Sequence, residues 1–105
     1  MKKQNLFENI PSSIPEELFE EIDSADDVKI ERIISDGHKS PPGFWYDQDK
    51  NELVFLLSGY GVIEFENSRK VKLNPGDYLK INAHEKHRVA ETSNSTKTIW
   101  LAIHY

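Results

Sequence analysis

The chain has 105 residues, of which 13 are Lys or Arg and 18 are Asp or Glu, so its net charge is -5 near neutral pH. This length suits one domain with a single core. The negative charge opposes attraction to phosphate backbones and anionic lipids, so we expect neither a nucleic acid nor a membrane as a partner. The absence of cysteine excludes disulfides, zinc-thiolate sites and cysteine nucleophiles.

The first residues do not have the pattern of an export signal. Met1, Lys2 and Lys3 are followed by "QNLFENIPSSIPEE", which has polar residues and prolines where an apolar core of about 7–15 residues would be needed. No apolar run approaches the roughly 20 residues of a membrane-spanning helix. We therefore expect a soluble, cytoplasmic protein.

The segment "SSIPEELFEEI", residues 12–22, has the pattern of a helix start. Ser13 is placed as an N-cap, Glu16 follows three residues later, and a proline lies in the first turn. The apolar positions that would then share one stripe are Leu18, Phe19 and Ile22. We expect residues 1–27 to form an N-terminal arm with a short helix packed on a larger domain, and a partner-binding helix is the alternative.

From residue 28 onward, short runs of β-branched and aromatic residues alternate with turn residues, the pattern of an antiparallel sandwich or barrel. The expected strands cover residues 28–34, 52–57, 61–66, 70–73, 77–81, 87–91 and 97–105. The longest irregular segment is "SDGHKSPPGFWYDQDKN", and a loop of this length in a compact domain is commonly functional or disordered. The sequence therefore predicts an all-β domain over residues 28–105.

Alternation within two expected strands brings polar side chains onto apolar faces. In "ELVFLL", Glu52 shares a face with Val54 and Leu56, and in "HRVAET" His87 shares a face with Val89. A carboxylate or an imidazole is costly to bury there unless it finds a hydrogen bond, an opposite charge or a metal. Bonds between the two residues, to loop backbone or to water at an open barrel mouth would also meet that need.

Two segments resemble the paired motifs of the cupins, which are small β-barrels. Glu52 and Gly59 are separated by six residues, as at the end of the first motif, and Gly76, "NAH" and His87 have the spacing of the second. The most specific part is "LNPGDYLKINAHEKHRV". The resemblance covers roughly residues 28–104 and implies a cupin-type β-barrel, also called a jelly roll or double-stranded β-helix.

The sequence departs from this family at the metal ligands. The family holds a metal with three histidines and one glutamate, and only His87 and Glu52 match that set. The positions that correspond to the first-motif histidines are Tyr46 and Gln48 in one register, or Trp45 and Asp47 in the other. His84 stands where the second motif has a glycine, which favours an exposed turn residue.

A bound metal would, by this resemblance, be a divalent ion such as Mn, Fe, Ni or Zn. Oxygen donors with one imidazole suit harder ions such as Mn, Fe(II) or Mg. The candidate ligands are Gln48, Glu52, His87, Asp47 and His104. Gln48 is favoured over Asp47 because it shares parity with Glu52, whereas Asp47 is the better ligand chemically but needs a bulge or a turn. His104 has a structural role as its simpler explanation.

We expect the chain to bind a small molecule in the barrel, with such a metal as a candidate cofactor. The alternatives are a metal-free cupin that binds or senses a ligand, and a metal-dependent oxygenase or isomerase, the chemistry that the resemblance implies. In an enzyme, Tyr46 or His38 would donate the proton, with His38 in a loop that could fold over the mouth. A third alternative, from another class, is a structural or partner-binding module that uses the apolar runs "LVFLL" and "TIWLAI" as a homodimer interface.

Overall fold

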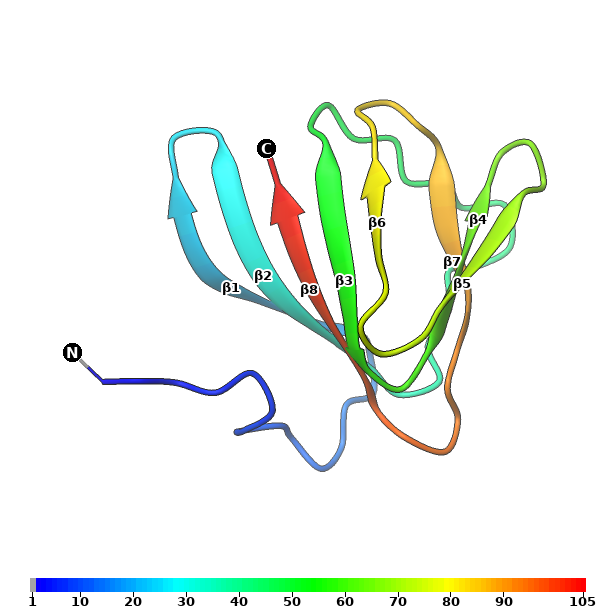
Figure 1. The fold of residues 1–105 in the computed structure, drawn as a ribbon. Helices are drawn as coiled ribbons and strands as arrows, with labels where there is room; N and C mark the ends of the chain where they lie inside the picture. Colours follow the sequence, from blue (N-terminus) through cyan, green and yellow to red (C-terminus); the bar gives the residue numbers. More distant parts are fainter. Residues whose placement is uncertain (1) are drawn as a thin grey trace.

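The computed structural model describes residues 2–105, which form two antiparallel sheets that face each other (Figure 1). The larger sheet has the strand order β1-β2-β8-β3-β6, and the smaller has the order β5-β4-β7. The strands are β1 (Leu18–Ala25), β2 (Val28–Ser35), β3 (Glu52–Ser58), β4 (Gly61–Phe65), β5 (Lys70–Leu73), β6 (Tyr78–Ile81), β7 (His87–Thr92) and β8 (Thr98–His104). The sheets meet at one end and diverge at the end where β3 begins.

The strands expected from residue 28 onward are confirmed, and their inward faces form the core. In β3, Glu52, Val54 and Leu56 are buried while the residues between them are half-buried, which is the alternation of a strand between a core and an outer face. The buried apolar cluster between the sheets consists of Ile33, Val54, Leu56, Ile63, Phe65, Leu73, Ile81, Trp100 and Ala102.

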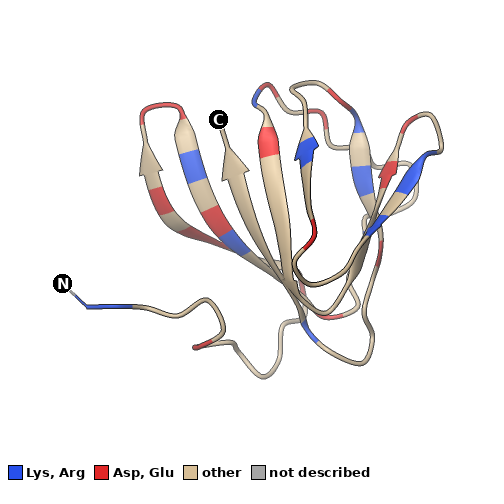
Figure 2. Ribbon diagram, viewed as in Figure 1, with Lys and Arg blue, Asp and Glu red and all other residues tan. Residues whose placement is uncertain are grey.

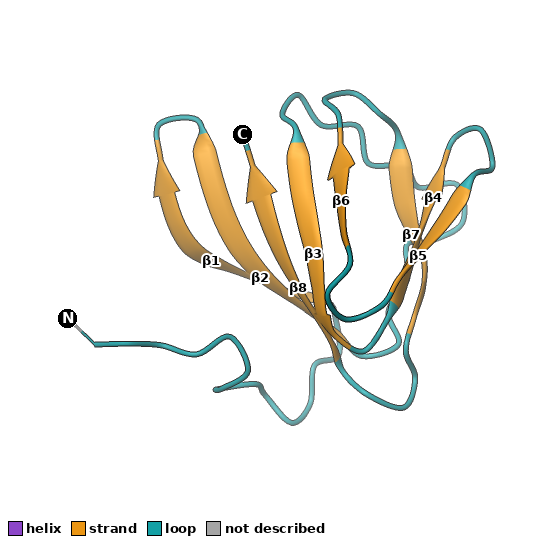
Figure 3. Ribbon diagram, viewed as in Figure 1, coloured by secondary structure: helices purple, strands orange, loops and turns teal. Residues whose placement is uncertain are grey.

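The expected N-terminal helix is wrong. Residues 2–105 contain no helix (Figure 3), and hence none that is long and apolar enough to cross a membrane. Residues 18–25 instead form β1, which pairs with β2 from Leu18 opposite Ile34 to Ala25 opposite Val28. This pairing satisfies backbone groups and extends the sheet, which outweighs a weak local helix preference. The hairpin also crosses the expected boundary at residue 27.

The residues before β1 are tied to the sheet by one buried arginine, Arg32 of β2. Its guanidinium donates hydrogen bonds to the backbone carbonyls of Leu6, Glu8 and Asn9 at 3.0, 2.7 and 3.3 Å. Its Nε donates to the Glu20 carboxylate of β1 at 2.8 Å. Because charge and hydrogen-bonding capacity are both met, burial of this arginine is not left uncompensated.

Trp100 of β8 fills the space between the two sheets and is only 3% exposed. Its ring lies against Gly61 at the start of β4, where an added Cβ would be 2.2 Å from Cη2 and 2.4 Å from Cζ2 of the indole. These are rigid ring atoms in a packed core, so they cannot move away cheaply. Gly61 is therefore required for the indole to occupy this position.

We predict that Gly61→Ala destabilises the fold by about 1–3 kcal/mol through overpacking against Trp100, measured by urea unfolding. Gly43→Ala is the matched control, since its Cβ would meet nothing within 4 Å and only its positive φ of 80° opposes the change. A loss no larger than that of the control would show that the indole is not confined by Gly61.

Candidate functional site

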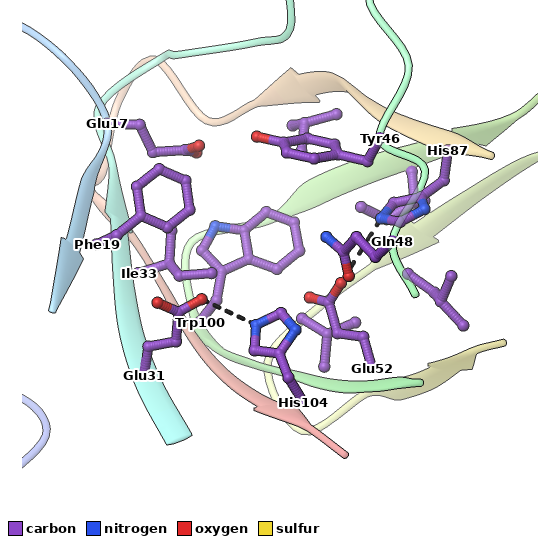
Figure 4. Close-up of a pocket in the computed structure, with 14 residues that line it drawn as sticks. Glu17, Phe19, Glu31, Ile33, Tyr46, Gln48, Glu52, His87, Trp100 and His104 are labelled. Carbon is purple, nitrogen blue, oxygen red and sulfur yellow. Dashed lines mark hydrogen bonds and ion pairs between the residues drawn. The ribbon is translucent and has the colours of Figure 1, made fainter. Parts of the chain in front are cut away.

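A cavity of about 70 Å³ lies between the sheets, lined by both of them and by the segment before β3 (Figure 4). That volume can hold several water molecules or a small organic molecule. Its walls are mainly apolar, and three carboxylates, two imidazoles, a phenol and an amide face it. None of the described residues that line it is a lysine or arginine.

Glu52 and His87 form a buried pair in this cavity, which is one of the alternatives that the strand alternation left open. Nε2 of His87 lies 3.6 Å from Oε1 of Glu52, and the two residues are only 5% and 7% exposed. Glu52 is the only Lys, Arg, Asp or Glu residue of β3, and β8 has none, in agreement with the red band on β3 in Figure 2. Nδ1 of His87 lies 2.9 Å from the carbonyl oxygen of Glu85 and donates to it, so Nε2 is the nitrogen that faces Glu52.

The protonation of His87 reflects two opposing effects. Burial lowers the pKa of the imidazole, but Glu52 and the Glu85 carbonyl raise it more, so it lies above the ordinary value of 6.5. The protonated form therefore has a hydrogen to donate from Nε2 toward Glu52. The pair can exchange a proton with a bound molecule, which is the basic requirement for acid-base chemistry.

Tyr46 is placed over this pair by its backbone. Tyr46 and His87 form an antiparallel bridge in which each amide donates to the other's carbonyl, and the two rings stack with centroids 5.4 Å apart. Burial raises the pKa of the Tyr46 phenol, and the nearby carboxylates of Glu17, Glu52 and Glu31 raise it further. The phenol therefore stays protonated near neutral pH and can donate a hydrogen bond into the cavity.

Two registers were possible for the positions where the family has histidines, and the structure favours the one with Tyr46 and Gln48. Tyr46 and Gln48 both line the cavity, whereas Asp47 does not. Asp47 lies at the exposed rim, where its carboxylate is 2.8 Å from Nδ1 of His84. His84 has a positive φ of 61° in the turn before β7, and its amide donates to the Gln48 carbonyl at 2.6 Å. The rim pair thus holds the segment that carries Gln48.

At the other end of the cavity lies Glu17, which the sequence analysis missed. The Trp100 indole Nε1 donates to Ser35 Oγ at 3.2 Å, and the Ser35 hydroxyl in turn donates to Glu17 Oε2. An indole can only donate, so the order of this chain is determined. Burial raises the pKa of Glu17 above 4.5, although the Ser35 hydrogen bond opposes the rise.

Buried Glu31 and half-buried His104 form a second pair in the cavity wall. Nε2 of His104 is 2.8 Å from Oε1 of Glu31, and Lys29 approaches the other carboxylate oxygen at 3.7 Å. His104 was among the expected metal ligands, whereas Glu31 was not predicted to lie in the site. The signal available was parity, because Glu31, Ile33 and Ser35 share one face of β2.

His38 does not line the cavity. Its Nδ1 accepts a hydrogen bond from the Asp36 amide at 2.9 Å, and its Nε2 lies 3.0 Å from the carbonyl of Pro15, to which it donates. Both ring nitrogens are thus bonded to backbone groups, which ties the loop after β2 to the segment before β1.

The donors in the cavity do not fit the metal site that the cupins often have. Across residues 2–105 there is no cluster of three or more His, Asp or Glu side chains that could hold a metal ion. Glu52 and His87 are two donors, and the remaining imidazole, His104, is engaged by Glu31. A metal at His87 would also have to displace a proton that Glu52 stabilises. Gln48 could add only a weak amide oxygen.

Solved structures resemble this chain along its length. A Ralstonia eutropha protein named as a "putative mannose-6-phosphate isomerase" is 45% identical, with 99% of this chain and 97% of that chain covered and a TM-score of 0.95. A cupin superfamily protein from Desulfitobacterium hafniense is 24% identical over 90% and 82% of the two chains, with a TM-score of 0.74. An RmlC-like cupin protein from Desulfovibrio desulfuricans is 17% identical over 99% and 96%, with a TM-score of 0.75.

The last two similarities lie below 25% identity and establish the fold alone. No curated protein matches the chain. A family model described as "Cupin domain" matches residues 33–104, which include all of β3 to β8 and the last three residues of β2. The residues that line the cavity lie within this matched region except for Glu17, Phe19 and Glu31. The chain therefore belongs to the cupin family.

Proposed function

We propose that this cupin binds a small organic molecule without a phosphate or other anionic group in the cavity between its sheets, and that binding requires no metal. The observation that carries the proposal is the buried Glu52–His87 pair facing a cavity of about 70 Å³. Burying two charged groups is costly, and replacing such a pair by apolar residues is commonly neutral or stabilising. A polar anchor for a ligand gives the pair a function that stability alone does not.

Charge argues against a phosphorylated ligand. The relative named as a mannose-6-phosphate isomerase would imply a sugar phosphate, but phosphate recognition generally uses Arg, Lys or a helix N-terminus. The described lining residues include no Arg or Lys, and residues 2–105 contain no helix. With Glu17, Glu31 and Glu52 in its wall, the cavity repels an anion.

The word isomerase in that name implies acid-base chemistry, which the cavity residues support better than they support phosphate binding. This chemistry suggests a second candidate function. Glu52, His87 and the Tyr46 phenol lie together in the wall, and proton exchange with a hydroxyl or carbonyl compound needs such groups within hydrogen-bond reach. Isomerisation of an uncharged substrate by these three residues is therefore the enzymatic alternative. The homodimer expected from the sequence stays a prediction.

Replacing Glu52 with Gln should lower the pKa of His87, because the effect of burial would then act with less opposition. NMR titration of the imidazole resonances measures this. In the folded wild type the raised pKa stabilises the fold below pH 6.5, and that contribution is lost as pH rises through the higher folded-state pKa. Glu66→Gln is the control, since Glu66 is exposed and pairs with Lys86. A His87 pKa that is unchanged or higher in Glu52→Gln would contradict the pairing.

The cavity should be the binding site in a thermal-shift screen of neutral polyols, amines and phosphorylated sugars. We expect hits only among compounds without an anionic group. For a hit, the double variant Glu52→Gln, His87→Asn should raise Kd by about tenfold or more, since one good charged hydrogen bond is worth about 1.5–3 kcal/mol. Isothermal titration calorimetry gives the values.

The matched control neutralises an exposed ion pair of the same separation, as Glu66→Gln, Lys86→Gln. Both residues are exposed, neither lines the cavity, and Nζ of Lys86 lies 3.6 Å from Oε2 of Glu66. Equal loss of affinity in both double variants would place binding elsewhere, as would hits that are all phosphorylated. Tyr46→Phe provides a conservative third variant if the buried changes impair folding, which circular dichroism reports.

Metal removal should leave the protein unchanged. We expect untagged protein to hold well below one equivalent of divalent metal by elemental analysis, and its Tm to be the same with and without EDTA. A bound metal would stabilise the fold by mass action, by about 2.7 kcal/mol at a hundredfold excess over Kd. One equivalent of metal together with a fall in Tm on chelation would overturn the metal-independent part of the proposal.

A further inference from the structure

The end of the cavity farthest from His87 combines aromatic rings with carboxylates. Figure 4 shows Phe19, Ile33 and Trp100 around the space between Glu17 and Glu31, with the Tyr46 hydroxyl directed toward Glu17. Trp100 cannot turn away, because its Nε1 is bonded to Ser35 and its ring lies against Gly61. Trp100 is thus a fixed part of a wall that is made by β1, β2, β8 and Glu17, the residue before β1.

The charges of this wall are not balanced within the protein. Glu52 is paired with His87, and Glu31 with His104, but Glu17 accepts only from the uncharged hydroxyl of Ser35. His38 lowers the pKa of the Glu17 carboxyl, but its ring nitrogens are hydrogen-bonded to backbone groups of Asp36 and Pro15 and not to Glu17. A carboxylate that faces a cavity and forms no ion pair with the described residues favours a ligand that brings a cation.

Resting on the function proposed above, we propose that this end of the cavity binds an alkylated ammonium group, such as a quaternary amine. The negative faces of Phe19 and Trp100 and the Glu17 carboxylate attract the positive charge. A primary ammonium would need acceptors for three hydrogens, whereas the Glu31 oxygens are already engaged by His104 and Lys29. An alkylated cation has a weak hydration shell to lose, and its methyl groups suit Ile33 and the rings.

Burial of Glu17 adds a second expectation. Burial raises the pKa of Glu17, and a cation bound next to the carboxylate would lower this pKa again. Cation binding therefore releases protons from this site, and its affinity increases as pH rises above 4.5. The measured enthalpy of binding should then depend on the ionisation enthalpy of the buffer.

The test compares choline with the neutral alcohol in which a carbon atom replaces the choline nitrogen, a pair matched in shape. We expect calorimetry to give choline about tenfold or more higher affinity, which corresponds to about 1.4 kcal/mol. Glu17→Gln should reduce this preference severalfold, whereas Glu16→Gln, at the exposed neighbouring position, should leave it unchanged. Glu17→Gln should also fold well, because it removes a half-buried carboxylate, and its Tm reports this.

The outcomes separate this inference from the function on which it rests. Equal affinity for both compounds, or weaker affinity for choline, overturns the ammonium proposal while binding sensitive to Glu52 and His87 still supports the site. A choline preference that survives Glu17→Gln also overturns it. If no compound of the screen binds in a manner sensitive to Glu52 and His87, the proposed function itself is wrong.

Discussion

The position of the Trp100 indole is the constraint on which both the core and the cavity depend. The ring separates the two sheets, and its contact with Gly61 sets how closely β4 can approach β8. The same ring forms a wall of the cavity, and its one polar atom begins the hydrogen-bond chain to Ser35 and Glu17. Core packing and the orientation of Glu17 therefore depend on the same ring, because moving the Trp100 indole would disturb both.

At the opposite end of the cavity, backbone pairing positions the polar side chains. The bridge between Tyr46 and His87 joins the segment before β3 to the smaller sheet, so the two rings stack because their backbones are paired. Glu52 belongs to the larger sheet, and its approach to His87 depends on how the sheets face each other. The polar groups thus come from distant parts of the chain and meet only in the closed fold. That is typical of sites built on a rigid scaffold.

Much of this architecture could be predicted from the sequence, and the reasons differ by region. Alternation located seven strands and brought Glu52 and His87 to the inner face, and the spacing around Gly76 indicated the cupin fold, which the family match confirms. β1 was missed because proline, an N-cap and a helical stripe all favoured a helix locally, while its pairing with β2 is a tertiary effect. Glu17 and Phe19 were missed with it.

Glu31 was not predicted as a site residue for another reason. It is followed by Arg32, and both are buried, one facing the cavity and the other the N-terminal arm, so "VKIERII" shows no simple alternation. Parity groups Glu31 with Ile33 and Arg32 with Ile34, so it could suggest Glu31 as an inward residue but could not select it over Arg32. The rim bond between Asp47 and His84 likewise joins residues 37 positions apart in loops, beyond the reach of periodicity.

The contacts of Arg32 have a consequence for how the N-terminal arm can vary. The guanidinium binds backbone carbonyls of Leu6, Glu8 and Asn9 rather than their side chains. Every residue type has a carbonyl, so this attachment does not specify the side chains at Leu6 and Glu8, whereas the positive φ of 55° at Asn9 favours Asn, Asp or Gly there. Selection on this attachment would act on Arg32 and on the number of residues between the arm and β1, both of which determine whether the carbonyls reach the same point.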